Sequence, residues 1–96
     1  MADIKMARIY LTEADKLMNA IMSYLHNEAN VHGVTVLKAV AGFGKSGVLH
    51  TAGQPGANLP LMVEFFDDAK KVDRVVEHVK TMLGSDHVIT WSVAMP

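Results

Sequence analysis

A glycine-rich segment in the middle of the chain constrains the fold more than any other feature. Residues 42–58, GFGKSGVLHTAGQPGAN, contain five of the seven glycines in a chain of 96 residues. Glycine adopts backbone angles that are unfavourable for other residues, and its lack of a side chain lets a ligand approach the main chain closely. Loops of this length are uncommon in a small domain and are usually functional or disordered. We therefore expect two structured regions joined by a loop that carries the function.

The regions on both sides of this segment alternate strand-like and helical patterns. Four runs of β-branched and apolar residues are expected to be strands: residues 6–11, 34–41, 59–66 and 87–94. One helix should follow Thr12–Asp15, which has capping-box spacing, and reach about Ala29. A second should open at Asp67 and Asp68 and end at Gly84. The order βαββαβ predicts an α+β, ferredoxin-like sandwich with a long glycine-rich loop between its second and third strands.

Such a sandwich has helices on one sheet face and leaves the other face open. The strand at 34–41 is apolar on both sides, and Trp91 is expected in the core or at a subunit interface. An apolar open face would be a liability in a monomer, so we expect an oligomer. Arg8 and Lys38 are expected to point toward this face, where they would pair with Glu64 between subunits or bind an anion.

Composition excludes several classes of function. A net charge of −1 and a pI of about 6.5 give no electrostatic case for binding nucleic acid or an anionic membrane. Without cysteine there is neither a disulfide nor a thiolate metal site. No apolar run approaches the roughly 20 residues of a membrane span, and the N-terminus is too polar for a signal peptide. We expect one cytoplasmic domain over residues 1–96, with no membrane insertion.

Two phosphate-binding motifs are matched only superficially. Residues 42–47 read G-x-G-x-x-G after a strand, but the residues that follow are not expected to form the helix that a dinucleotide fingerprint requires. Residues 39–46, AVAGFGKS, miss the P-loop pattern at Ala39 and lack the same helix. Two interpretations of the segment remain open. Its glycine amides form an anion-binding nest beside Lys45, or the loop is flexible and its lysine solvated.

The remaining polar residues give weaker signals. The five histidines are never spaced at i,i+3 or i,i+4, which gives a local metal site little support. His50, in the middle of the loop, is the strongest candidate among them for a ligand contact. The turn Gly84–Asp86 before His87 either contacts a phosphate or simply connects a helix to a strand. No nucleophile–base–acid set can be argued from spacing, so no catalytic residue is predicted.

The run VTVLKAVAGFG at residues 34–44, with His50-Thr51, Asn58-Leu59-Pro60 and Ile9-Tyr10, resembles the PII signalling superfamily. It is most similar to a group of PII-like proteins with short chains. The resemblance implies a non-enzymatic homotrimer that binds adenine nucleotides in clefts between subunits. It also implies that the long loop, called the T-loop, changes shape with the ligand. The loop would then control an unidentified partner, a membrane transporter or an enzyme.

The resemblance places the nucleotide site at the base of the loop. The candidate binding residues, including the polar ones above, are Gly42, Phe43, Gly44, Lys45, Ser46, His50, Leu59, Pro60, Gly84, Ser85 and His87. The chain departs from the superfamily in its second phosphate-binding turn, which is only Gly84–His87 and has no lysine. With so few cations, AMP, ADP or cyclic AMP is favoured over ATP as the effector.

Two other classes share the expected architecture. A trimer similar to the CutA proteins would bind divalent metals through histidines. A small ferredoxin-like enzyme of the dimeric monooxygenase type would have a pocket on the open sheet face near Trp91. Neither class requires the glycine-rich loop, so the sensor is the leading hypothesis.

Overall fold

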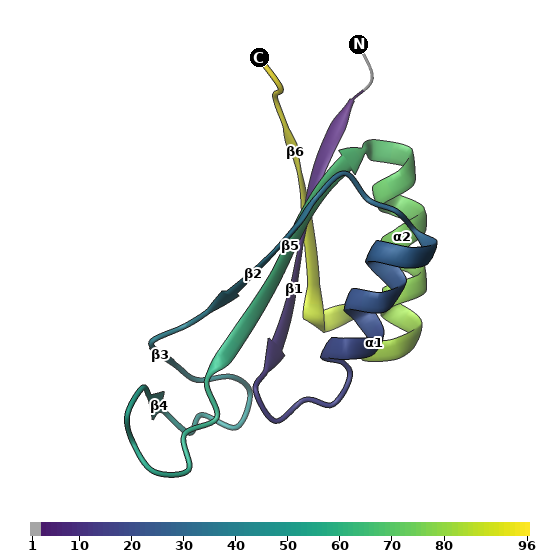
Figure 1. Ribbon diagram of the computed structural model, residues 1–96. Helices are drawn as coiled ribbons and strands as arrows, with labels where there is room; N and C mark the ends of the chain where they lie inside the picture. The colour runs from purple at the N-terminus through teal and green to yellow at the C-terminus, as the bar shows by residue number, and fades with distance from the viewer. Residues whose placement is uncertain (1–2) are drawn as a thin grey trace.

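The computed structural model of the chain describes residues 3–96; residues 1 and 2 of the expected domain lie outside it. Four antiparallel strands form one sheet in the order β2–β5–β1–β6, with both helices on one face (Figure 1). The elements of these two layers are β1 (Ile4–Thr12), α1 (Met18–Ser23), β2 (Val34–Lys38), β5 (Pro60–Asp68), α2 (Ala69–Leu83) and β6 (Val88–Val93). The expected α+β architecture is confirmed.

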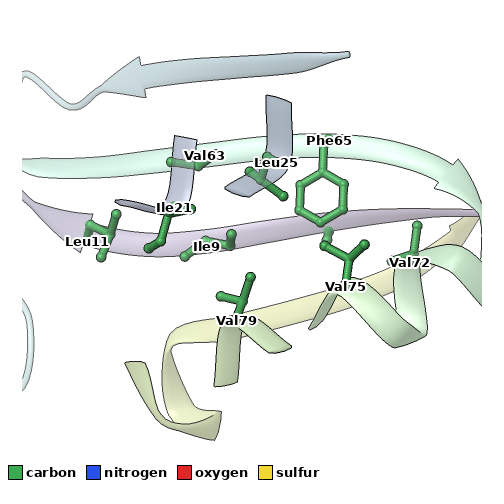
Figure 2. Close-up of a cluster of buried hydrophobic side chains, with 10 residues drawn as sticks. Ile9, Leu11, Ile21, Leu25, Val63, Phe65, Val72, Val75 and Val79 are labelled. Atoms are coloured by element: carbon green, nitrogen blue, oxygen red, sulfur yellow. The ribbon is translucent and has the colours of Figure 1, made fainter. Parts of the chain in front are cut away.

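The core lies between the helices and the two central strands. Ile9 of β1 is opposite Val63 of β5, and Ala7 is opposite Phe65, so alternate residues of both strands face the helices. The buried residues of this layer are Ala7, Ile9, Leu11, Ile21, Leu25, Val63, Phe65, Val72, Val75 and Val79 (Figure 2). Three valines of α2 supply part of the helical side, as their spacing predicts, and Ile21 and Leu25 supply the rest.

The second helix begins later than predicted and ends where predicted. β5 continues through Asp67 and Asp68 and passes directly into α2 at Ala69. Asp67 is therefore the end of a strand rather than the first turn of a helix. Gly84 ends α2 with a φ of 89°, and its N–H donates to the Lys80 carbonyl oxygen at 2.8 Å. Glycine reaches this angle without strain, which explains its place there.

The predicted capping box at Thr12–Asp15 is wrong. Thr12 is still in β1, paired with Pro60, and α1 begins only at Met18 with no side-chain cap. Strand pairing therefore outcompetes the local capping pattern at Thr12. After α1 the helix widens into a π-helix, η1 (Tyr24–Glu28), which keeps Leu25 buried.

The strand expected at 34–41 is divided in two. β2 ends at Lys38, and a separate β3 (Ala41–Gly42) pairs with β4 (His50–Thr51). The glycine-rich loop therefore contains a small hairpin, which lies beyond the end of the main sheet in Figure 1. A 3-10 turn, η2 (Ser85–His87), precedes β6, so His87 does not open the last strand as predicted.

The other sheet face has no helix over it and is largely apolar. Its exposed large side chains include Tyr10, Leu37, Ile89 and Trp91. The Arg8 guanidinium lies 5.3 Å from the centre of the Trp91 ring.

An ion pair lies among these side chains. Arg8 Nε donates to Glu64 Oε2 at 2.5 Å, so the pairing predicted between subunits instead occurs within one chain. The same prediction is wrong for Lys38. That residue is aligned with Leu61 on the helix side, and its Nζ lies 2.8 Å from Glu13 Oε2.

Candidate functional site

A hollow of about 330 Å³ lies at the base of the glycine-rich loop. Its lining comes from four separate parts of the sequence: Tyr10, Leu11, Thr12, Asp15, Phe43, Gly44, Lys45, Pro60, Asp86 and His87. They meet because antiparallel pairing brings the end of β1 beside the start of β5. The η2 turn then brings the last two lining residues to the same end of the sheet.

One wall of the hollow is the start of the segment that connects the two strands of the small hairpin. Phe43 follows β3 directly, and the residue is 68% exposed. A turn closes after it, with the Gly47 N–H donating to the Gly44 carbonyl oxygen at 3.0 Å. A side chain on Gly42 would start 2.9 Å from Pro60 Cγ, whereas one on Gly44 would meet nothing within 4 Å. Gly42 is thus needed for packing, and Gly44 leaves its backbone open to the hollow.

The lining also contains a cluster of charged and titratable side chains. Lys45 Nζ donates a hydrogen bond to Asp86 Oδ2, which lowers the pKa of the Asp86 carboxyl below its usual value. His87 Nδ1 lies 3.1 Å from the Tyr10 carbonyl oxygen. Because a carbonyl oxygen only accepts, Nδ1 must carry the proton. Nε2 of the same ring lies 3.6 Å from Asp86 Oδ1.

The return of the loop is held by side-chain contacts to the β1–α1 connection. Asn58 accepts the Ala14 N–H at 2.8 Å, and its own N–H donates to His50 Nδ1 at 3.0 Å. Glu13 Oε1 accepts the Leu59 N–H at 3.0 Å. The ion pair with Lys38 and this backbone hydrogen bond both lower the pKa of Glu13. These contacts order the base of the loop without contributing to the lining of the hollow.

The structure brings together five of the predicted binding residues: Phe43, Gly44, Lys45, Pro60 and His87. The others lie beside the hollow rather than on its wall. Ser46 Oγ accepts the Val48 N–H. Gly42 begins the loop, and Leu59 directly follows its last residue. His50 holds the loop's return, and Gly84 and Ser85 belong to the turn that carries Asp86.

Sequence reasoning missed the other half of the lining. Tyr10, Leu11, Thr12 and Asp15 come from the end of β1 and the turn after it, and Asp86 comes from η2. The ferredoxin-like topology itself contains the missing signal, because it aligns the end of the first strand with the start of the third. The turn containing Asp86 was recognised, but the acidic residue was given no role.

Other features add little to this site. No helix follows the G-x-G-x-x-G match, as predicted, since residues 43–49 lead into β4. A second hollow of about 370 Å³, around Lys5 and Ser92, contains none of the predicted binding residues. Within residues 3–96, no three or more His, Cys, Asp or Glu side chains gather as a metal site would require. None of the helices described is long and apolar enough to span a membrane.

Comparisons with known proteins give both a family and a fold. The family model DUF190, described as "Uncharacterized ACR, COG1993", matches residues 4–95. A UPF0166 protein of Aquifex aeolicus is 32% identical over 82 residues, which cover 79% of this chain and 78% of that protein.

Three solved structures have similar folds. CPII of Thiomonas intermedia K12, bound to ADP and bicarbonate, has a TM-score of 0.65 at 20% identity, covering 98% of this chain and 91% of that chain. The divalent ion tolerance protein CutA1 of Ehrlichia chaffeensis has a TM-score of 0.69 at 11% identity, covering 100% of this chain and 86% of that chain. The GlnK–ATP complex of B. subtilis has a TM-score of 0.61 at 19% identity, covering 96% of this chain and 85% of that chain.

At these identities the solved structures establish the fold alone, and it is the ferredoxin-like fold common to PII-like proteins and CutA1. The match over residues 4–95 and the Aquifex relative establish the family. The chain therefore belongs to the DUF190 family, and its architecture is that of the PII-like proteins.

Proposed function

We propose that the protein is a non-enzymatic, cytoplasmic sensor of an adenine nucleotide. The ligand, AMP, ADP or cyclic AMP in preference to ATP, binds in the hollow at the base of the glycine-rich loop. Binding changes the shape of residues 42–58, which control a partner protein, a membrane transporter or an enzyme. The whole chain, residues 1–96, acts as one domain of a homotrimer.

The observation that carries this proposal is the hollow itself. Its volume of about 330 Å³ is at the lower end of the range for small-molecule sites, roughly 300–1,000 Å³. Phe43 offers an aromatic surface against which a base can stack, and Lys45 offers a cation for phosphate. The fold is similar to that of CPII, whose structure was solved with ADP and bicarbonate, and to that of GlnK, whose structure was solved with ATP.

The charge of the lining supports a ligand with few phosphates. Asp15 and Asp86 line the hollow together with one lysine and one histidine. Two carboxylates oppose the accumulation of negative charge, and each further phosphate adds to that opposition. A monophosphate or diphosphate suits this lining better than a triphosphate.

The uncovered sheet face supports the homotrimer. Tyr10, Leu37, Ile89 and Trp91 are exposed on the sheet face that also carries the Arg8–Glu64 ion pair. Packing such faces together removes apolar area from water. A neighbouring subunit would then supply the missing wall of the open hollow.

The test is a thermal-shift panel on the purified protein, with AMP, ADP, ATP, cyclic AMP, copper and zinc as probes. A ligand at 100 times its dissociation constant adds about 2.7 kcal/mol. For a domain of this size that corresponds to a shift of several degrees. Stabilisation by AMP, ADP or cyclic AMP exceeding that by ATP is the expected result. A response to metal alone would contradict the proposal and favour a CutA-like function.

A matched pair of glycine variants tests the location of the site. Gly44→Val should abolish nucleotide binding, because its new side chain points into open space that the ligand would occupy. Gly33→Val is the control, since a side chain there also meets nothing within 4 Å. Calorimetric titration with ADP and light scattering measure binding and mass. Normal binding by Gly44→Val would show that the loop base is not the site.

A further inference from the structure

The ion pair between Lys45 and Asp86 joins two segments that are far apart in the sequence, the glycine-rich loop and the turn between α2 and β6. Both residues line the hollow, and both side chains are exposed, 87% for Lys45 and 49% for Asp86. Ion pairs this exposed contribute little to folding stability. Stability therefore does not account for an acidic side chain held against the lysine of the site.

The Asp86 carboxylate is held in the way that a bound anion would be held. Lys45 donates to Oδ2, and the His87 ring lies beside Oδ1. That ring is oriented by the Tyr10 carbonyl oxygen, which leaves Nε2 on the side of the carboxylate. The lysine that donates to this carboxylate is equally suited to donate to a phosphate oxygen.

We infer that Asp86 is a specificity-determining residue that competes with the phosphate of the ligand for Lys45. This inference rests on the proposed function, because it takes the hollow as the ligand site. Binding would exchange the Lys45–Asp86 contact for a Lys45–phosphate contact. The displaced carboxylate stays beside the phosphate and repels it more strongly as ligand charge increases. Asp86 thereby selects ligands of low negative charge, and the exchange releases the loop from the η2 turn.

The test compares Asp86→Asn with the wild-type protein by calorimetry at low ionic strength. The titrants are ADP and inorganic pyrophosphate, which has the phosphates without the nucleoside. Asp86→Asn should bind both at least about threefold more tightly, as expected for removing an exposed competing charge in weakly screening buffer. Asp73→Asn is the matched control, since Asp73 is also exposed and also pairs with a lysine, Lys5, at 2.8 Å. It should leave both affinities unchanged.

The Lys45→Gln background separates competition from general repulsion. If Asp86 acts by occupying Lys45, the gain from Asp86→Asn should be smaller when Lys45 is replaced, because only the direct repulsion between carboxylate and phosphate then remains. A gain that persists undiminished there would overturn the inference. Equal or weaker pyrophosphate binding by Asp86→Asn, or no binding, would also overturn it. A different result would contradict the nucleotide proposal. In that case ADP would bind no more tightly than pyrophosphate, both to the wild-type protein and to Asp86→Asn.

Discussion

At the scale of single residues, Asp67 shows how one carboxylate connects several elements. Its Oδ2 accepts the His32 N–H at 3.0 Å and lies 3.2 Å from Lys71 Nζ. Its Oδ1 accepts the Asp68 N–H at 2.7 Å. Burial raises the pKa of Asp67, but these hydrogen bonds and the lysine outweigh it, so the pKa is lowered overall. The ionised form therefore stabilises the end of β5, the start of α2 and the entry to β2 together.

Asp67→Asn should lower the free energy of unfolding by about 1–2 kcal/mol at neutral pH. A lowered folded-state pKa means that the contribution is complete above the unfolded carboxyl pKa of about 3.9. It is lost as the pH falls through the lower folded value. Urea unfolding of both proteins between pH 7 and pH 3 should show the difference shrinking toward acid. A difference that stays constant over this range would contradict the role of the charge.

Residue-level reasoning from the sequence succeeded where the local pattern and the fold agree. The valine stripe of α2 and the glycine at its end were predicted because helical periodicity and positive φ are local properties. The roles of Asp86 and Thr12 were not predicted, because these residues contact segments that are distant in the sequence. Thr12 pairs with Pro60, and Asp86 bonds Lys45. No pattern confined to neighbouring residues contains that information.

At the scale of elements, the glycine-rich loop is more ordered than its composition indicates. Its β3–β4 hairpin is followed by turns in which the Gln54 N–H donates to Thr51 and the Ala57 N–H to Gln54. Gly47, Gly53 and Gly56 all have positive φ, so they lie in defined turns rather than in irregular chain. The length of the loop was predictable, but its hairpin was not, because two-residue strands carry no periodicity.

Asn58→Ala should loosen this loop without unfolding the domain. The substitution removes the acceptor for the Ala14 N–H, which contributes up to about 1 kcal/mol. Limited proteolysis within residues 46–57 should accelerate by about fivefold, the population change that such an energy produces. Gln54→Ala, at an exposed position of the same loop, is the control and should leave the rate unchanged. Equal cleavage rates for the two variants would mean that Asn58 does not hold the loop.

At the scale of the whole molecule, the helices lie on one face of the sheet and leave the other free (Figure 1). The sequence predicted this asymmetry because the βαββαβ order of its elements is that of a sandwich with both helices on one sheet face. It could not predict that Arg8 and Glu64 pair within the chain, since that depends on the register of β1 against β5. A half-buried ion pair on an otherwise apolar face also constrains how a second copy can pack there.

Leu37→Asp should convert the proposed trimer into a monomer. The side chain is 41% exposed on the open face, and a buried, unpaired carboxylate there would be strongly unfavourable. Light scattering should give a mass near 10.5 kDa for the variant and three times that for the wild type. Lys70→Glu, on an exposed position of α2, is the charge control and should keep the wild-type mass. A trimeric Leu37→Asp would place the interface elsewhere.

The composite lining of the hollow has a consequence for the lifetime of the protein. Residues from the beginning, middle and end of the chain meet there, so no fragment or partly unfolded form retains the complete surface. A ligand held there binds only the fully folded molecule, and its binding energy therefore opposes global unfolding. Because cellular proteases act on opened forms, a fall in ligand concentration would shorten the half-life of the protein. The abundance of the protein would then follow the supply of its ligand.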